Sequence, residues 1–153
     1  MKKEHSEPRI LKKTNLIGQI LIEKGLISSE QLEEALRLQK KGGQLLGSVL
    51  VSLGLIPEET LGIVLANQCG LTFIPIERYN ISKGMLKMIP QETLLKYSFV
   101  PLEMIGGVVT VAMANPFDEE AKDAMRRNLP YKVVLAIAGK TQIEKIINTH
   151  YKD

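Results

Sequence analysis

Two stretches of the chain carry the same pattern of apolar residues, glycines and polar positions. Residues 16–39 align with residues 45–68, and ten of the 24 aligned pairs are identical. Other pairs exchange one aliphatic residue for another, such as Ile17 with Leu46. Because one register preserves the glycines, the leucine spacing and a final glutamine together, the two stretches form a tandem repeat. The identical pairs are Leu16/Leu45, Gly18/Gly47, Leu21/Leu50, Gly25/Gly54, Leu26/Leu55, Ile27/Ile56, Glu30/Glu59, Leu32/Leu61, Leu36/Leu65 and Gln39/Gln68.

The first copy of the repeat predicts a helix, a tight turn and a second helix. Its apolar residues between positions 17 and 21 recur at the spacing of one helix face. Gly25 follows them and supplies the positive φ that ends a helix at low cost. Ser28 and Gln31 then have the form of a capping box, which begins the next helix.

The second copy repeats this arrangement. Gly54 stands at the end of its first helix, and Pro57 stands in the first turn of the next, where a missing N–H costs nothing. Gly42 and Gly43 join the two copies, and Gly70 closes the last helix. Two helical hairpins of this size cannot bury their apolar faces separately, so we expect them to pack as one four-helix unit.

Beyond Gly70 the pattern changes to short β-prone runs separated by helices. Gly106-Gly107 lies between two such runs and is a strong hairpin signal. Strands separated by helices predict an α/β subdomain with a small mixed sheet. The expected strands are residues 71–76, 99–105, 108–114 and 131–138, and the expected helices are residues 82–88, 91–97, 118–128 and 141–151.

The predicted fold class is therefore α+β. An N-terminal four-helix unit, built from two helix-turn-helix repeats, precedes the α/β subdomain. The expected ranges are a basic leader at 1–14, a tandem-repeat helical subdomain at 15–70 and an α/β subdomain at 71–153.

Composition narrows the class of protein. An apolar fraction of 44% and a charged fraction of 24% are typical of a soluble globular protein. With no Trp, three Phe and four Tyr, the chain offers few stacking platforms for single-stranded nucleic acid, so neither DNA nor RNA is an expected partner. No segment approaches the roughly 18 consecutive apolar residues of a membrane span. We expect a cytoplasmic protein that reaches the inner membrane only through a partner.

The net charge of +3 is mild, and the start of the chain supplies much of it. Such a basic cluster either touches phosphates and anionic membrane surfaces or is a solvated leader. The basic residues concerned are Lys2, Lys3, Arg9, Lys12 and Lys13.

The inventory of catalytic residues is poor. His5 and His150 stand at opposite ends of the chain, and Cys69 is the only cysteine, so no Cys/His metal spacing exists. We expect no enzyme activity, no metal and no cofactor. The carboxylates of the repeats fall in first turns or on polar faces of the predicted helices, where they favour the helix dipole or solvation. These carboxylates are Glu30, Glu33, Glu34, Glu58 and Glu59.

Gly139-Lys140-Thr141 follows a predicted strand, precedes a predicted helix and so resembles the end of a phosphate-binding P-loop. The full pattern requires a glycine five residues before Gly139, where this chain has Val134. Without that glycine no cradle of backbone N–H groups forms around phosphates. The sequence favours a turn glycine before a Thr-capped helix, and we expect no nucleotide hydrolysis.

The paired glycines admit two interpretations. Gly18 and Gly47 lie near predicted helix starts, where free N–H groups favour an anion and the lack of a side chain lets a ligand approach the backbone. A duplicated unit suits a two-fold symmetric ligand with two bases and two phosphates. Alternatively, the leucines form the core and the glycines allow close helix packing. The candidate ligand-binding residues are Ile17, Gly18, Leu21, Gly25, Gln39, Leu46, Gly47, Leu50, Gly54 and Gln68.

The repeat resembles the tandem 24-residue motif in the N-terminal domains of type II secretion and type IV pilus assembly ATPases, including the mannose-sensitive haemagglutinin pilus type. The five-residue spacer between the copies matches that family as well. The resemblance continues through the second half and covers about residues 15–151. The matching residues of the first copy are Leu16-Ile17-Gly18, Leu21-Ile22, Gly25, Ile27, Gln31-Leu32, Ala35-Leu36 and Gln39, and those of the second half include Gly70-Leu71, Ile89-Pro90, Val100-Pro101-Leu102 and Ala112-Met113-Ala114-Asn115-Pro116.

This resemblance implies a regulatory and docking domain whose ATPase core would lie on a separate C-terminal region. Domains of this family dock the ATPase to an inner-membrane secretion or pilus component, and a subset binds cyclic di-GMP through the tandem motif. Leu16 and Leu45 replace the basic residue that often begins each motif, and leucine cannot make the charge-assisted hydrogen bonds of an arginine. Three hypotheses therefore stand side by side: a cyclic di-GMP sensor, a pure protein docking module without a nucleotide ligand, and a free-standing adaptor encoded without an ATPase.

Overall fold

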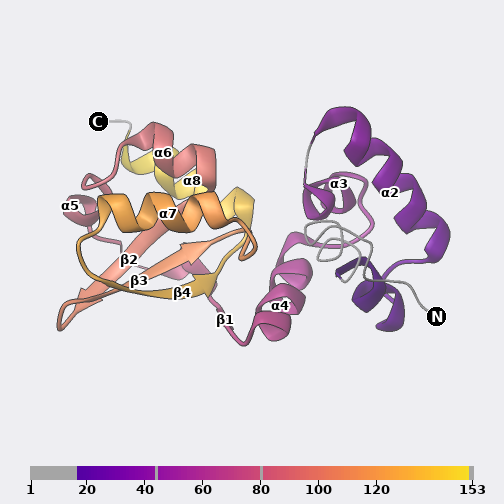
Figure 1. The fold of residues 1–153 in the computed structure, drawn as a ribbon, viewed down its shortest axis with the longest axis horizontal. Helices are drawn as coiled ribbons and strands as arrows, with labels where there is room; N and C mark the ends of the chain where they lie inside the picture. The colour runs from indigo at the N-terminus through magenta and orange to yellow at the C-terminus, as the bar shows by residue number, and fades with distance from the viewer. Residues whose placement is uncertain (1–16, 44, 80, 152–153) are drawn as a thin grey trace, which may run out of the picture. The chain divides into compact units, whose positions relative to one another are not determined.

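The chain divides into two compact units, Met1–Pro57 and Glu58–Asp153. The computed structural model describes residues 17–43, 45–79 and 81–151, so the predicted basic leader and Leu16 lie outside the described residues. Figure 1 shows helices in the first unit and a sheet with helices in the second.

The first helix of each repeat copy ends in a turn of matching geometry. A helix over residues 17–23 ends at Gly25, which has a φ of 74°. Helix α3 (Leu46–Ser52) ends at the equivalent Gly54, which has a φ of 75°. The N–H of each glycine donates to the carbonyl three residues earlier, at 2.9 Å in the first copy and 3.0 Å in the second. Two copies of one sequence pattern thus form the same turn.

The predicted capping box begins helix α2 (Ser29–Gly42). The N–H of Gln31 donates to Ser28 Oγ at 3.1 Å, and the N–H of Ser28 donates to Gln31 Oε1 at 2.8 Å. Helix α2 packs against α3. Leu21 and its repeat equivalent Leu50 are fully buried, as is Ala35 on α2, so the aliphatic stripe of the repeat forms the core of this unit.

The second unit is built on a four-stranded sheet in the order β1-β4-β3-β2. Strands β2 and β3 form an antiparallel hairpin, whereas β3 pairs with β4 and β4 pairs with β1 in parallel, which confirms the predicted mixed sheet. Gly106 and Gly107 turn the hairpin with φ angles of 57° and 78°, the conformation that the Gly-Gly signal predicted. The strands are β1 (Thr72–Phe73), β2 (Phe99–Ile105), β3 (Val108–Met113) and β4 (Lys132–Ile137).

The helices of this unit agree closely with the predicted ranges, and α6, α7 and α8 gather beside the sheet (Figure 1). The expected strand over 71–76 is shortened to two residues, because Pro75 has no N–H for the ladder and begins a 3₁₀ turn instead. The elements are η2 (Ile76–Arg78), α5 (Lys83–Leu86), α6 (Gln91–Tyr97), α7 (Glu119–Asn128) and α8 (Lys140–His150).

Edge strand β2 carries an irregularity. Its register with β3 shifts between Pro101 and Glu103, and Pro101 has no N–H to donate. Bulges and prolines are typical of edge strands, because one side of an edge strand has no neighbouring strand to pair with.

The last helix of the repeat, α4 (Glu58–Cys69), contacts β1 and β4. For this reason the compact units divide at Pro57, whereas the repeat pattern predicted a four-helix unit with a boundary near residue 70. Gly62 permits this packing. A Cβ at Gly62 would lie 2.5 Å from Cε1 of Phe73 on β1, so any side chain there would displace the ring.

Tyr151, directly after α8, ties that helix to the α5–α6 segment. Its hydroxyl lies 2.6 Å from the carbonyl oxygen of Leu86 and 2.5 Å from that of Ile89, and it donates its single proton to this pair of acceptors. Burial raises the pKa of the Tyr151 phenol above its ordinary value of 10.0, because ionisation would place a charge beside apolar groups.

We expect the Tyr151→Phe variant to lose about 1 kcal/mol of unfolding free energy near neutral pH, the usual net contribution of an intramolecular hydrogen bond. The phenol pKa is raised in the folded state, so its contribution is fully present below about pH 10 and is lost as the pH rises above it. Urea titrations of both proteins from pH 8 to 11 would measure this. A wild type and a variant that lose stability in parallel above pH 10 would contradict the assignment.

Candidate ligand-binding site

The ten candidate residues from the repeat fall into three environments. All except Gln68 belong to the first unit, and Gln68 is exposed on α4 in the second. Four apolar candidates are buried: Ile17 (6% exposed), Leu21 (0%), Leu46 (5%) and Leu50 (0%). These side chains pack in the core, which is one of the two interpretations that the sequence left open for them.

Different structural features account for the presence of glycine at the candidate positions. Gly25 and Gly54 are exposed and adopt positive φ, and a Cβ at either position would meet nothing within 4 Å, so they are required by the turns alone. Gly18 is buried, and a Cβ there would lie 2.8 Å from both Cδ atoms of Leu32. Gly47 is half-buried as the second residue of α3. Close helix packing therefore explains Gly18 without a ligand.

The surface features of the repeat are its turns and its polar helix ends. Gln39 is half-buried in the last turn of α2, among the exposed Lys40 and Lys41. Leu45, where the related motif often has a basic residue, precedes α3 and is 49% exposed. Its side chain makes no capping hydrogen bond. An exposed leucine at this position provides apolar contact area and no charge.

The P-loop-like Gly139-Lys140-Thr141 begins α8, as predicted, but Thr141 does not cap the helix. Gly139 is the N-cap residue and makes no side-chain cap. Instead, the N–H and the hydroxyl of Thr141 both donate to Glu58 Oε2, each at 3.0 Å. A carboxylate of this chain thus lies at the N-terminus of α8, where an anion is favoured.

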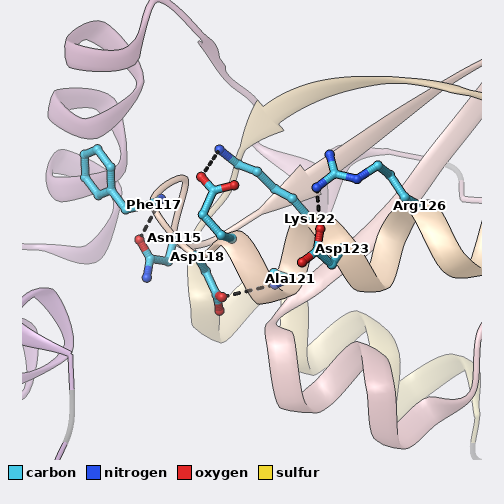
Figure 2. Close-up of polar contacts among 8 residues, drawn as sticks. Asn115, Phe117, Asp118, Ala121, Lys122, Asp123 and Arg126 are labelled. Carbon is cyan, nitrogen blue, oxygen red and sulfur yellow. Dashed lines mark hydrogen bonds and ion pairs between the residues drawn. The ribbon is translucent and has the colours of Figure 1, made fainter. Parts of the chain in front are cut away.

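The loop between β3 and α7 shows the local use of other polar groups (Figure 2). Asn115 Oδ1 accepts from the N–H of Phe117 at 3.0 Å, and Asp118 caps α7 by accepting from the N–H of Ala121 at 3.0 Å. Further along α7, Lys122 pairs with Glu119 and Arg126 pairs with Asp123. Asn115 and Asp118 thus support a turn and a helix start, and the two ion pairs lie on the exposed face of α7.

Neither a metal-binding cluster nor a membrane-spanning helix is found among the residues that the structure describes. Within residues 17–43, 45–79 and 81–151, His, Cys, Asp and Glu side chains do not form a group of three or more that could hold a metal ion. In the same ranges, every helix is too short or too polar to cross a membrane.

Sequence reasoning missed Glu58, which it assigned to the dipole of its own helix. No local pattern contains its contact with Thr141, but the sequence does contain a signal that α4 packs differently from α2. The first copy has Glu33 and Arg37 where the second has Gly62 and Ala66, so the second copy lost charged positions from a helix face. Loss of polar residues from one copy of a repeat indicates that this copy is buried on an additional side.

Comparison with known proteins places these observations in a family. A family model described as the MshEN domain matches residues 69–153. Type IV pilus assembly ATPase PilB of Myxococcus xanthus is 29% identical over 137 residues, which cover 90% of this chain and 24% of that protein. PilB of Thermus thermophilus is 36% identical over 122 residues, covering 79% and 14%. Bacteriophage adsorption protein B of Escherichia coli K12 is 32% identical over 127 residues, covering 83% and 17%. The chain spans no more than 24% of these curated relatives.

Solved structures agree with the α+β fold. The structure of MshE with cdg, cyclic di-GMP, aligns with a TM-score of 0.74 at 31% identity, over 88% of this chain and 98% of that chain. The N-terminal domain of XpsE aligns with a TM-score of 0.72 at 20% identity, over 86% and 91%, and supports the fold alone. The predicted fold class is confirmed.

The packing role of Gly18 can be separated from a ligand role without a ligand. We expect Gly18→Ala to cost about 1–3 kcal/mol of unfolding free energy, because the new Cβ overpacks the contact with Leu32. Leu32→Ala removes all three side-chain atoms that the Cβ would meet. In that background Gly18→Ala should cost much less, and a double-mutant cycle by urea denaturation measures the difference. Strictly additive effects would contradict the packing role.

Proposed function

Because the chain belongs to the MshEN domain family, we propose that it is a regulatory module that binds cyclic di-GMP through its tandem repeat. The observation that carries this proposal is the duplicated turn. Gly25 and Gly54 present the same φ and the same backbone hydrogen bonds in both copies, which suits a ligand with two equivalent halves. The likeness to MshE with cdg over 88% of the chain supports it.

The proposed ligand site consists of surface groups held on a buried framework. The two turns, Gln39 and Gln68 supply backbone and amide groups for phosphates and base edges. The buried apolar candidates fix the helices from beneath. The framework residues are the buried Ile17, Gly18, Leu21, Leu46 and Leu50, together with the half-buried Gly47.

We further propose that the module serves a longer protein, a type II secretion or type IV pilus assembly ATPase. Its catalytic core would lie outside this sequence, and an inner-membrane component of the machine would be the docking partner. The similarity to PilB from two organisms supports this assignment.

One observation favours the second candidate function, protein docking without a nucleotide. Leu38, Leu45 and Leu53 of the first unit are 39–49% exposed. Exposed leucines on a small helical unit provide apolar area for a protein partner, and Leu45 stands where a basic residue would favour phosphate.

Titration calorimetry of the 153-residue chain with cyclic di-GMP tests the proposal. We expect saturable binding by the wild type. We expect the double variant Leu16→Arg/Leu45→Arg to bind at least about tenfold more tightly, because each arginine adds charge-assisted hydrogen bonds to a phosphate. A gain of affinity is easier to interpret than a loss of affinity in a Gly18 variant, because a substitution at Gly18 also disturbs the packing with Leu32.

The matched control is Glu33→Gln/Glu34→Gln, which changes the net charge by the same two units at exposed positions of α2 in the same unit. This control should leave the affinity near that of the wild type. Equal gains in both variants would indicate nonspecific attraction of an anion. Absence of binding by the wild type and by the Leu16→Arg/Leu45→Arg variant, with both proteins folded, would overturn the proposal and leave docking as the function.

A further inference from the structure

Helices α2 and α4 are equivalent in the repeat but differ on one face. In α2 this face carries Glu33, Glu34 and Arg37, all exposed. The equivalent positions of α4 are Gly62, Ile63 and Ala66, and both Gly62 and Ala66 are buried. Helix α4 therefore keeps the apolar stripe of the repeat and has gained a second apolar face, whereas α2 has only the first.

The second face of α4 lies against the edge of the sheet. Gly62 leaves the space that the Phe73 ring occupies, and Phe73 is paired in register with Ile137 of β4. The C-terminal end of α4 continues through Gly70 and Leu71 into β1, and the N–H of Leu71 donates to the carbonyl of Ala66 at 2.8 Å. Apolar contacts along the helix carry little directional preference, so a directional contact at the N-terminal end would restrain it further.

Glu58, the first residue of α4, makes that contact. Its Oε2 accepts two hydrogen bonds from Thr141, and these join residues 83 positions apart in the sequence. A Cβ at Gly139 would lie 2.7 Å from Oε1 of Glu58, so a side chain there would displace the carboxylate from this position. The negative charge also meets the positive end of the α8 dipole.

We infer that Glu58 is a positioning residue for the ligand site: it fixes α4 on the α/β unit and thereby sets the position of Gln68 near the other end of the helix. This inference rests on the proposed function, since Gln68 is the proposed ligand residue of the second copy. Binding at Gln68 is then linked to the α/β unit through one helix.

Two substitutions at Glu58 separate charge from geometry. Glu58→Ala removes the acceptor, whereas Glu58→Gln keeps an oxygen acceptor of the same length and removes the charge. The matched control is Glu59→Ala, an exposed carboxylate in the same first turn of α4. Thermal unfolding of each variant establishes that it is folded.

The first measurement is amide hydrogen exchange without ligand. In Glu58→Ala we expect about tenfold faster exchange at Thr141 and along the first turns of α4, since opening of the contact becomes easier. Glu58→Gln should recover part of the protection, and Glu59→Ala should match the wild type. Unchanged exchange in Glu58→Ala would overturn the role of Glu58 as an anchor.

The second measurement is the affinity for cyclic di-GMP. We expect Glu58→Ala to bind about fivefold more weakly or worse, a modest coupling between separate positions, with Glu58→Gln between it and the wild type. Faster amide exchange along α4 together with an unchanged affinity for cyclic di-GMP would overturn the link between Glu58 and the ligand. If the wild type does not bind cyclic di-GMP, the proposed function and the role of Gln68 are both overturned. The exchange data then still decide whether Glu58 anchors α4.

Discussion

The packing of α4 against β1 and β4 is the constraint on which the organisation of this chain depends. The helix arises from a duplicated sequence whose first copy needs only one apolar face. In the second copy the charged positions of α2 are replaced by Gly62, Ile63 and Ala66, and Gly62 and Ala66 are buried. The Phe73 ring occupies the space that a side chain at position 62 would take. The duplication therefore kept the fold of a helical hairpin while reassigning one of its helices to a different compact unit.

The glycines illustrate how one residue type meets separate physical demands within a single motif. Gly25 and Gly54 are needed for backbone conformation, since their surroundings are open and only φ restricts the residue. Gly18, Gly62 and Gly139 are needed for space, since a neighbouring side chain occupies the volume of a Cβ. The motif thus combines turn formation with helix packing, and a ligand role for its glycines would be additional to these demands.

Local signals in the sequence predicted most of the elements. The capping box at Ser28 and Gln31, the helix over 91–97 and the Gly106-Gly107 hairpin depend on neighbouring residues, and all three are confirmed. The strand expected over 71–76 is too long because Pro75 has no N–H to donate to the ladder. The contact of Glu58 with Thr141 joins residues 83 positions apart, so no local pattern contains it. For the candidate site, the sequence identified the turn glycines as a pair, but it could not separate leucines of the core from leucines of the surface, because burial depends on tertiary packing.

The two edges of the sheet restrict how this domain can be recognised. Strand β1 is only two residues long. Strand β2, at the other edge, contains a proline and a shift in its register with β3. These features disfavour the addition of a further strand by main-chain pairing. The helix surfaces and side chains of the α/β unit are therefore better suited to recognition than its strand edges, a mode in which specificity is set by the identity of individual residues.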